Sequence, residues 1–92
     1  MQLQFRSGDV TLLLDGRVVE LFRATSEGST RYHVDHVRME ITPAKKGDGW
    51  QVRYGIDLSG MITGGGKFIV PVAQADELQR FIEAARAART NG

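Results

Sequence analysis

The stretch Ala75–Arg89, ADELQRFIEAARAAR, is the only segment of the sequence in which a helical period is sustained. Apolar residues recur in it at steps of three and four positions, the spacing that lines one face of an α-helix. They are Leu78, Phe81, Ile82, Ala85 and Ala88. Asp76 and Glu77 in the first turn, with Arg86 and Arg89 in the last, suit the helix macrodipole. The pattern predicts one amphipathic helix over residues 75–89, after a chain that otherwise reads as strands and turns.

The composition limits the class of protein. The 92 residues predict a single domain over residues 1–92. The sequence has no cysteine, which excludes disulfides and thiolate metal sites and fits a cytoplasmic protein. It has no apolar run of about 18 residues that could span a membrane, and its start lacks the pattern of a signal peptide. Twelve Lys and Arg against eleven Asp and Glu give a net charge of +1, which argues against a nucleic-acid-binding protein.

The first hairpin has the clearest local signal. Asp15-Gly16 separates two apolar runs, Asp9–Leu14 and Arg17–Arg23, and predicts a two-residue type I′ turn. That turn places two pairs on the core face: Val10 opposite Leu21, and Leu12 opposite Val19. Leu13 and Val18 then face each other on the outer side, where they either pack beneath another segment or form a contact surface.

The rest of the chain predicts more short strands. They are expected over Gln2–Arg6, Arg31–Val34, Arg38–Thr42, Trp50–Asp57 and Phe68–Val72. The apolar period slips by one residue at Asp35-His36, which indicates a bulge or a tight corner. Alternation predicts one buried face for the longest of these strands, made by Trp50, Val52, Tyr54 and Ile56. Leu58–Lys67, LSGMITGGGK, contains four glycines and predicts a mobile connection.

Short strands followed by one helix predict a mostly β fold, an antiparallel barrel or sandwich of about six to seven strands capped by helix 75–89. Three stretches resemble the pleckstrin-homology-like (PH-like) fold, and look closest to a short bacterial family found mainly in actinobacteria. They are VTLLLDGRVVELFR (10–23), YHVDHVRMEITPAKKGDGW (32–50) and FIVPVAQADELQRFIEAA (68–85). The resemblance implies two sheets and one C-terminal capping helix. It implies no single function, because PH-like domains bind lipid headgroups, peptides or each other.

No motif in the sequence predicts catalysis or a cofactor. His33 and His36 form the only histidine cluster, and no third histidine or cysteine exists to complete a transition-metal site. Gly64–Lys67 lacks the phosphate-loop pattern, because Met61 stands where the first glycine belongs and Phe68 replaces the Ser or Thr. No serine lies in a nucleophile motif. We therefore expect a non-enzymatic protein without a metal or cofactor.

Two further groups of residues are candidate contact surfaces. Met61 and Ile62 place apolar side chains in the glycine-rich segment, where they either fold back over the barrel or meet a partner. Lys45, Lys46 and Lys67 are the candidate contact for anionic lipid headgroups, with Met61 and Ile62 as an apolar tip.

The sequence thus predicts a non-enzymatic interaction module, which self-associates or binds a protein or peptide through an exposed sheet edge or a loop. The expected interaction surface comprises Leu13, Val18, Met61 and Ile62. The alternative is a peripheral binder of anionic lipid headgroups, and a third hypothesis is a small-molecule pocket beneath the helix. The sequence identifies neither the partner nor the oligomeric state.

Overall fold

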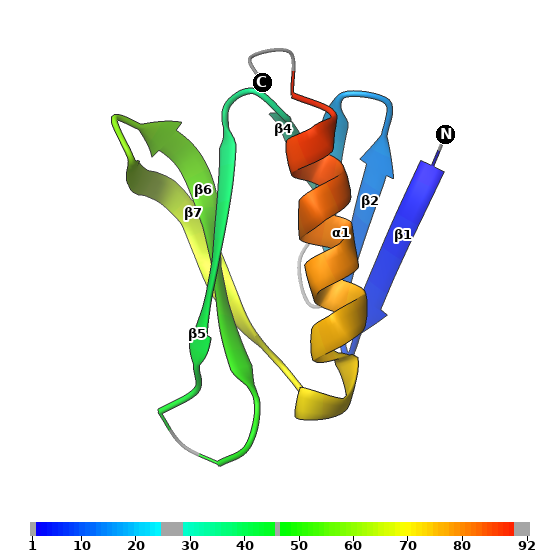
Figure 1. Cartoon of the computed structure of the whole chain (residues 1–92), viewed down its shortest axis with the longest axis vertical. Helices are drawn as coiled ribbons and strands as arrows, with labels where there is room; N and C mark the ends of the chain where they lie inside the picture. The colour runs from blue at the N-terminus through cyan, green and yellow to red at the C-terminus, as the bar shows by residue number, and fades with distance from the viewer. Residues whose placement is uncertain (1, 25–28, 46, 90–92) are drawn as a thin grey trace.

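The computed structural model describes residues 2–24, 29–45 and 47–89 (Figure 1). Its elements in chain order are β1 Gln2–Ser7, β2 Val10–Asp15, β3 Val18–Arg23, β4 Ser29–His33, β5 Val37–Pro43, β6 Trp50–Leu58, β7 Met61–Val70, the 3-10 helix η1 Val72–Gln74, and the α-helix α1 Ala75–Ala87. The predicted helix is confirmed, and it ends two residues earlier than the 75–89 expected. No helix in this part of the chain is long and apolar enough to cross a membrane.

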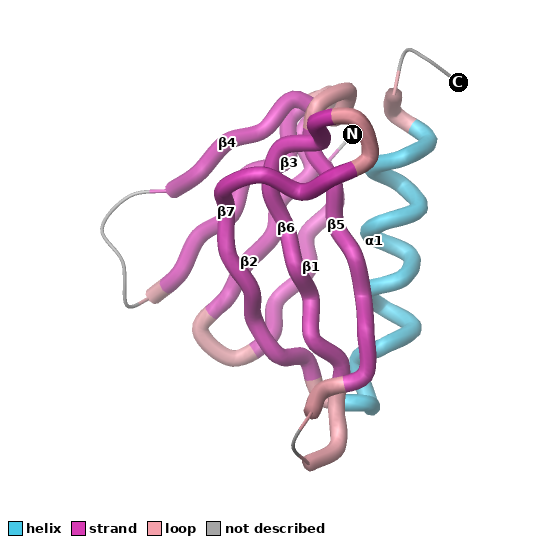
Figure 2. Tube along the Cα trace, turned by 90° about the vertical axis from the view of Figure 1, so that its left-hand side faces the viewer, coloured by secondary structure: helices cyan, strands magenta, loops and turns pink. Residues whose placement is uncertain are grey.

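The strands form two antiparallel sheets, one in the order β1-β2-β3-β4 and one in the order β5-β6-β7. The predicted mostly β fold with one C-terminal helix is confirmed, in its sandwich form, because the two sheets do not close into a barrel. Helix α1 runs along one side of both sheets, between β1 and β5 (Figures 1 and 2). The amide Nε2 of Gln74 donates to the carbonyl of Arg6 at 2.8 Å, which ties the start of the helix to β1.

The core lies between the sheets and under the helix. Phe5, Leu12, Val52 and Val70 are fully buried from the two sheets. The predicted apolar face of α1 is confirmed, because Leu78, Phe81, Ile82 and Ala85 are all 3% exposed or less and Ala88 packs against the same core. A helix with this narrow apolar face is stable only when that face is covered, so docking on the sheets and helix formation depend on each other.

The first hairpin keeps its predicted faces but not its predicted register. Asp15 pairs with Val18, so the two turn residues are Gly16 and Arg17, and not Asp15 and Gly16. Only Gly16 of these has a positive φ, of 62°, which excludes a type I′ turn. A register shift of two residues leaves every side chain on its original face. The predicted core residues are therefore confirmed as buried, whereas their predicted pairs are wrong, since Leu12 lies opposite Leu21.

The prediction of a mobile connection over Leu58–Lys67 is wrong, because most of it belongs to β7. A type I′ turn lies here, at Ser59 and Gly60, whose φ angles are 54° and 85°. A carboxylate oxygen of Asp57 accepts from the N–H of Gly60 at 2.9 Å and fixes the turn. Ile56 is 44% exposed and not buried as predicted, although it lies opposite the buried Val37, and it follows the position where the register of β6 with β7 shifts.

Two expectations about the strand ends have different outcomes. Residues Val34–His36 form a turn between β4 and β5, which confirms the predicted corner, and Val34 is 1% exposed. The last strand stops at Val70, and Val72 lies in η1 with 56% of its surface exposed, so the predicted end of this strand at Val72 is wrong.

Candidate functional site

Strand β5 is one edge of its sheet, and its unpaired backbone groups can be identified. In an antiparallel pair, alternate residues direct both of their backbone groups toward the partner strand. Asp57 N–H donates to the His36 carbonyl at 2.7 Å, and Ala44 N–H donates to the Gly49 carbonyl at 3.1 Å. These bonds show that the even-numbered residues of β5 direct their backbone N–H and C=O groups toward β6. The positions that direct their backbone groups to the open edge are Val37, Met39, Ile41 and Pro43.

Both ends of this open edge are closed. Arg89 donates to the carbonyl of Val37 at 3.5 Å, and also to the carbonyls of Val34 at 2.9 Å and Asp35 at 3.2 Å. At the other end, Pro43 has no N–H to offer. Because proline and covering side chains are common ways to protect a sheet edge, the accessible part of β5 is the short segment 39–41.

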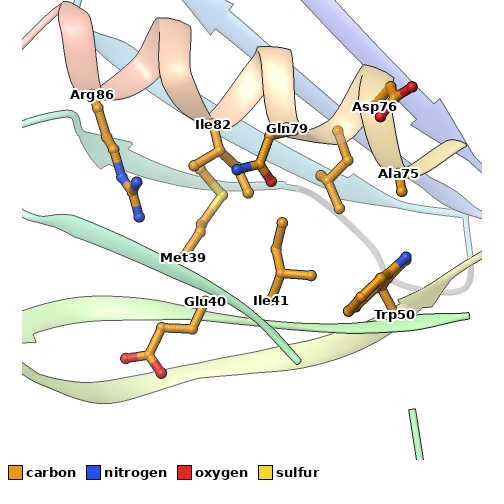
Figure 3. Close-up of a pocket in the computed structure, with 10 residues that line it drawn as sticks. Met39, Glu40, Ile41, Trp50, Ala75, Asp76, Gln79, Ile82 and Arg86 are labelled. Atoms are coloured by element: carbon orange, nitrogen blue, oxygen red, sulfur yellow. The ribbon is translucent and has the colours of Figure 1, made fainter. Parts of the chain in front are cut away.

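A cavity of about 520 Å³ opens between this segment and helix α1 (Figure 3). Its apolar lining comes from Met39, Ile41, Trp50, Leu78 and Ile82, and its polar lining from Glu40, Asp76, Gln79 and Arg86. Trp50 projects from the start of β6 toward the first turn of the helix, and Ile41 lies between Trp50 and Met39. The volume is within the range of about 300–1,000 Å³ that is typical of ligand sites.

A second cavity of about 250 Å³ continues the first toward the end of the helix. The two share Met39, Glu40, Ile82 and Arg86, and the second adds Arg38 and Arg89 among its lining residues. We call the two together the β5–α1 groove. The groove runs from Trp50 at one end to Arg89 at the other, beside the accessible backbone of β5.

The charges of the groove are unevenly distributed. Arg38 pairs with Glu40 at 2.9 Å and faces Asp57 at 3.6 Å, while Arg89 faces Asp57 at 3.8 Å. The hydrogen bond to Glu40 raises the pKa of Arg38. Among the described residues, the guanidinium of Arg86 makes no hydrogen bond or ion pair. The end of the groove near the helix C-terminus is therefore cationic.

Trp50 has an unusual environment. Its indole nitrogen is buried and has no hydrogen-bond acceptor within the described part of the chain. A buried donor without a partner is rare in folded proteins. Trp50 is also the single tryptophan of the sequence, so its fluorescence reports on this groove alone.

The two outer residues predicted as part of an interaction surface, Leu13 and Val18, are not directly opposite each other. Leu13 lies opposite Glu20, and Val18 lies opposite Asp15, so the two side chains do not face each other. Both are half-buried. Beside Leu13, hydrogen bonds from Ser29 and then Arg31 hold the pKa of Glu20 below its usual range. Leu13 thus lies next to an ion pair on a largely polar face, and not in a continuous apolar patch.

Met61 and Ile62 are neighbours on β7, so their side chains point to opposite faces of the hairpin. Met61 is 70% exposed and lies opposite Leu58, which is 55% exposed, whereas Ile62 is half-buried opposite Asp57. The exposed apolar pair at the hairpin tip is therefore Met61 with Leu58, a residue that the sequence analysis did not select.

The predicted lipid contact is spread over the molecule. Lys45 lies in the β5–β6 loop, and Met61 lies at the other end of β6 (Figure 1). The nine residues of β6 separate these ends by about 25 Å. Lys67 lies midway along β7, opposite Arg53, and Lys46 is outside the described residues. The structure does not bring Lys45, Lys67 and the apolar tip together.

The β4–β5 corner brings the two histidines close, with 5.8 Å between the ring centroids of His33 and His36. Nδ1 of His33 accepts from the Asp35 N–H at 3.1 Å and lies 3.6 Å from the Asp35 carboxylate. The described residues include no group of three potential metal ligands. We assign no ligand to this corner.

Replacing Arg89 by glutamine should lower the free energy of unfolding by about 1–2 kcal/mol, because three carbonyls lose a charged donor near the end of α1. Arg80→Gln, on the exposed side of the same helix, should change it by less than about 0.5 kcal/mol. Urea unfolding followed by Trp50 fluorescence measures both. Equal effects of the two substitutions would show that Arg89 does not anchor the helix.

Comparisons with protein-family models, with curated proteins and with solved structures found no significant match to this chain. The function has to be inferred from the groove itself.

Proposed function

We propose that this protein is a non-enzymatic interaction module that binds an extended peptide segment of a partner protein along β5. The segment adds a strand to the sheet, and its alternate side chains enter the β5–α1 groove. The observation that carries this proposal is the coincidence of free backbone groups at Met39 and Ile41 with an apolar groove beside the same two residues. Main-chain hydrogen bonds supply affinity in this mode, and the groove supplies specificity.

The groove suits a peptide better than a compact ligand. A small molecule needs a cavity that encloses most of its surface, whereas this groove borders the open edge of a strand along its length. The backbone groups of Glu40 point to β6 and those of Met39 and Ile41 point to the open edge, so an added strand would compete with no existing ladder bond at 39–41. The arrangement of two sheets and a capping helix supports our further proposal that the chain is a PH-like domain.

The test begins with selection from a random library of about twelve-residue peptides displayed against the folded protein. Binding of a selected peptide is then measured through Trp50 fluorescence. N-methylation of that peptide at alternate positions distinguishes β-augmentation from other modes, because only the amides that face β5 donate to it. We expect methylation to weaken binding at every second position and to have little effect between them. Uniform loss, uniform tolerance, or no enriched peptide would overturn the proposal.

Proline substitutions in β5 provide the matched test on the protein side. Ile41 directs its N–H to the open edge, so Ile41→Pro leaves the β5–β6 ladder intact. The natural Pro43 is another odd-numbered position of β5 at which the ladder needs no N–H. We expect Ile41→Pro to weaken binding of the selected peptide at least about tenfold, since one main-chain hydrogen bond is lost and the proline ring obstructs the added strand. Ile41→Ala, which keeps the N–H, should have the smaller effect on binding.

Thr42→Pro is the structural control, because the N–H of Thr42 bonds to β6. It should lower the stability more than Ile41→Pro, as measured by urea unfolding. Retention of full peptide affinity by folded Ile41→Pro would exclude the β5 edge as the binding site. Solution mass and vesicle sedimentation of the same variants would detect self-association or lipid binding instead.

A further inference from the structure

Resting on the proposed function, we infer that the peptide recognised by the β5–α1 groove carries a side-chain carboxylate two residues away from its apolar anchor, and that Arg86 binds this carboxylate. The inference gives the ligand a defined chemistry: an extended segment with an apolar residue and an Asp or Glu in alternate positions.

The first argument is the state of Arg86. It lines both cavities, is exposed, and has no hydrogen-bond or ion-pair partner for its guanidinium within the described residues. The other charges at that end of the groove are already satisfied. Arg38 holds Glu40, and Arg89 is bound to backbone carbonyls and faces Asp57. Arg86 is thus the lining cation available to an incoming group.

The second argument is spacing. On a strand added to β5, the side chains that enter the groove belong to residues opposite Met39 and Ile41, about 7 Å apart. The position opposite Ile41 faces the apolar end with Trp50 and Leu78. The position opposite Met39 faces Ile82 and Arg86, which are shared by both cavities. One position therefore favours an apolar side chain and the other an acidic one.

The third argument concerns the kind of anion. A guanidinium matches a carboxylate with two parallel hydrogen bonds, and a single positive charge balances a single negative charge. A phosphate carries nearly two negative charges at neutral pH and is usually met by a cluster of arginines. Since Arg38 and Arg89 are occupied by acids or carbonyls, the groove is complementary to a carboxylate.

The experiment repeats the peptide selection with three proteins: the natural sequence, Arg86→Glu and Arg80→Glu. Arg80 is the matched control, because it is an exposed arginine of the same helix that does not line the groove. We expect peptides selected on the natural sequence and on Arg80→Glu to carry Asp or Glu two positions from an apolar residue. On Arg86→Glu, Lys or Arg should replace the acid. The order of the two residues reports whether the peptide runs parallel or antiparallel to β5.

Affinities measured by Trp50 fluorescence then complete a double-mutant cycle. Changing the selected acid to its amide should weaken binding to the natural sequence about two- to fivefold, as expected for an exposed ion pair, and should not change binding to Arg86→Ala.

The outcomes separate the two proposals. Selected peptides that show the alternating N-methyl pattern but no acidic preference, or the same acidic preference on Arg86→Glu, would overturn the role of Arg86 and leave β5 as the binding edge. Tighter binding of a phosphoserine peptide than of the acidic peptide by more than tenfold would overturn the choice of a carboxylate. Absence of any selected peptide would overturn the proposed function itself.

Discussion

Replacing Gly65 by alanine should destabilise the protein by about 3–4 kcal/mol, whereas the same replacement at the neighbouring Gly64 should cost about 1 kcal/mol. Both glycines have a φ of 71°, so both substitutions place an L-residue in the left-handed region. They differ in what the added methyl group meets. At Gly65 it would collide with the carbonyl oxygen of Tyr54 and lie 2.8 Å from the Cα of Gly55, whereas at Gly64 no atom lies within 4 Å.

The close approach at Gly65 results from a bulge in β7. Tyr54 pairs with Gly66 and Ile56 pairs with Thr63, so β7 uses one more residue than β6 between these pairs. A side chain at Gly65 can be accepted only if the two strands separate, which breaks ladder hydrogen bonds. Urea unfolding of both variants gives the comparison. A cost at Gly65 no larger than that at Gly64 would mean that the strands can open here without loss of stability.

The glycine run shows where the sequence was misinterpreted. Four glycines between Leu58 and Lys67 favour a mobile connection if glycine is taken only as a source of flexibility. Glycine inside a strand also indicates a bulge or a close backbone approach, and three consecutive glycines before an apolar run fit that second interpretation. The dipeptide Ser59-Gly60 between Leu58 and Met61 was the hairpin signal that remained unused.

The buried faces of the strands and the helix were predictable because apolar residues recur at the period of the element that buries them. This recurrence is visible in a single sequence. Register is less visible, since a shift of two residues preserves each face and changes only the partners. The error at Gly16 is of this kind, because Asp-Gly favours one turn position and the structure uses the next. Ile56 was missed for another reason. Its alternation is regular, but the register of β6 with β7 shifts between Tyr54 and Ile56, and the alternation of one strand does not show such a shift.

A pocket beneath the helix was one of the hypotheses from the sequence, but the residues that line the groove could not be predicted. Met39, Ile41 and Trp50 have the pattern of core residues, and Arg86 has that of a helix-terminal cation. Their role depends on the distance between β5 and α1, two elements separated by more than thirty residues in the chain. One local signal did point to the place, since Pro43 in an otherwise regular strand indicates an edge.

Replacing Phe81 by alanine should lower the free energy of unfolding by about 3–5 kcal/mol, the usual cost of removing a buried aromatic side chain. Phe81 is 1% exposed and is among the largest fully buried side chains of the core. Phe22→Ala is the matched control, because the same side chain is 38% exposed on the outer face of its sheet. Phe22→Ala should lower the free energy of unfolding by less than about 1.5 kcal/mol, because the exposed Phe22 side chain removes less apolar area from water than the buried Phe81 side chain does.

The loss at Phe81 should act on function as well as on stability. Domains of this size have a total stability of about 5–14 kcal/mol, so the substitution consumes a large fraction of it. The groove exists only while α1 is docked beside β5, because Leu78 and Ile82 of its lining flank Phe81 on the helix. We therefore expect peptide binding to fall together with helix content, measured by Trp50 fluorescence and circular dichroism. Full peptide affinity in a Phe81→Ala protein that has lost its helical signal would mean that the helix is not part of the binding site.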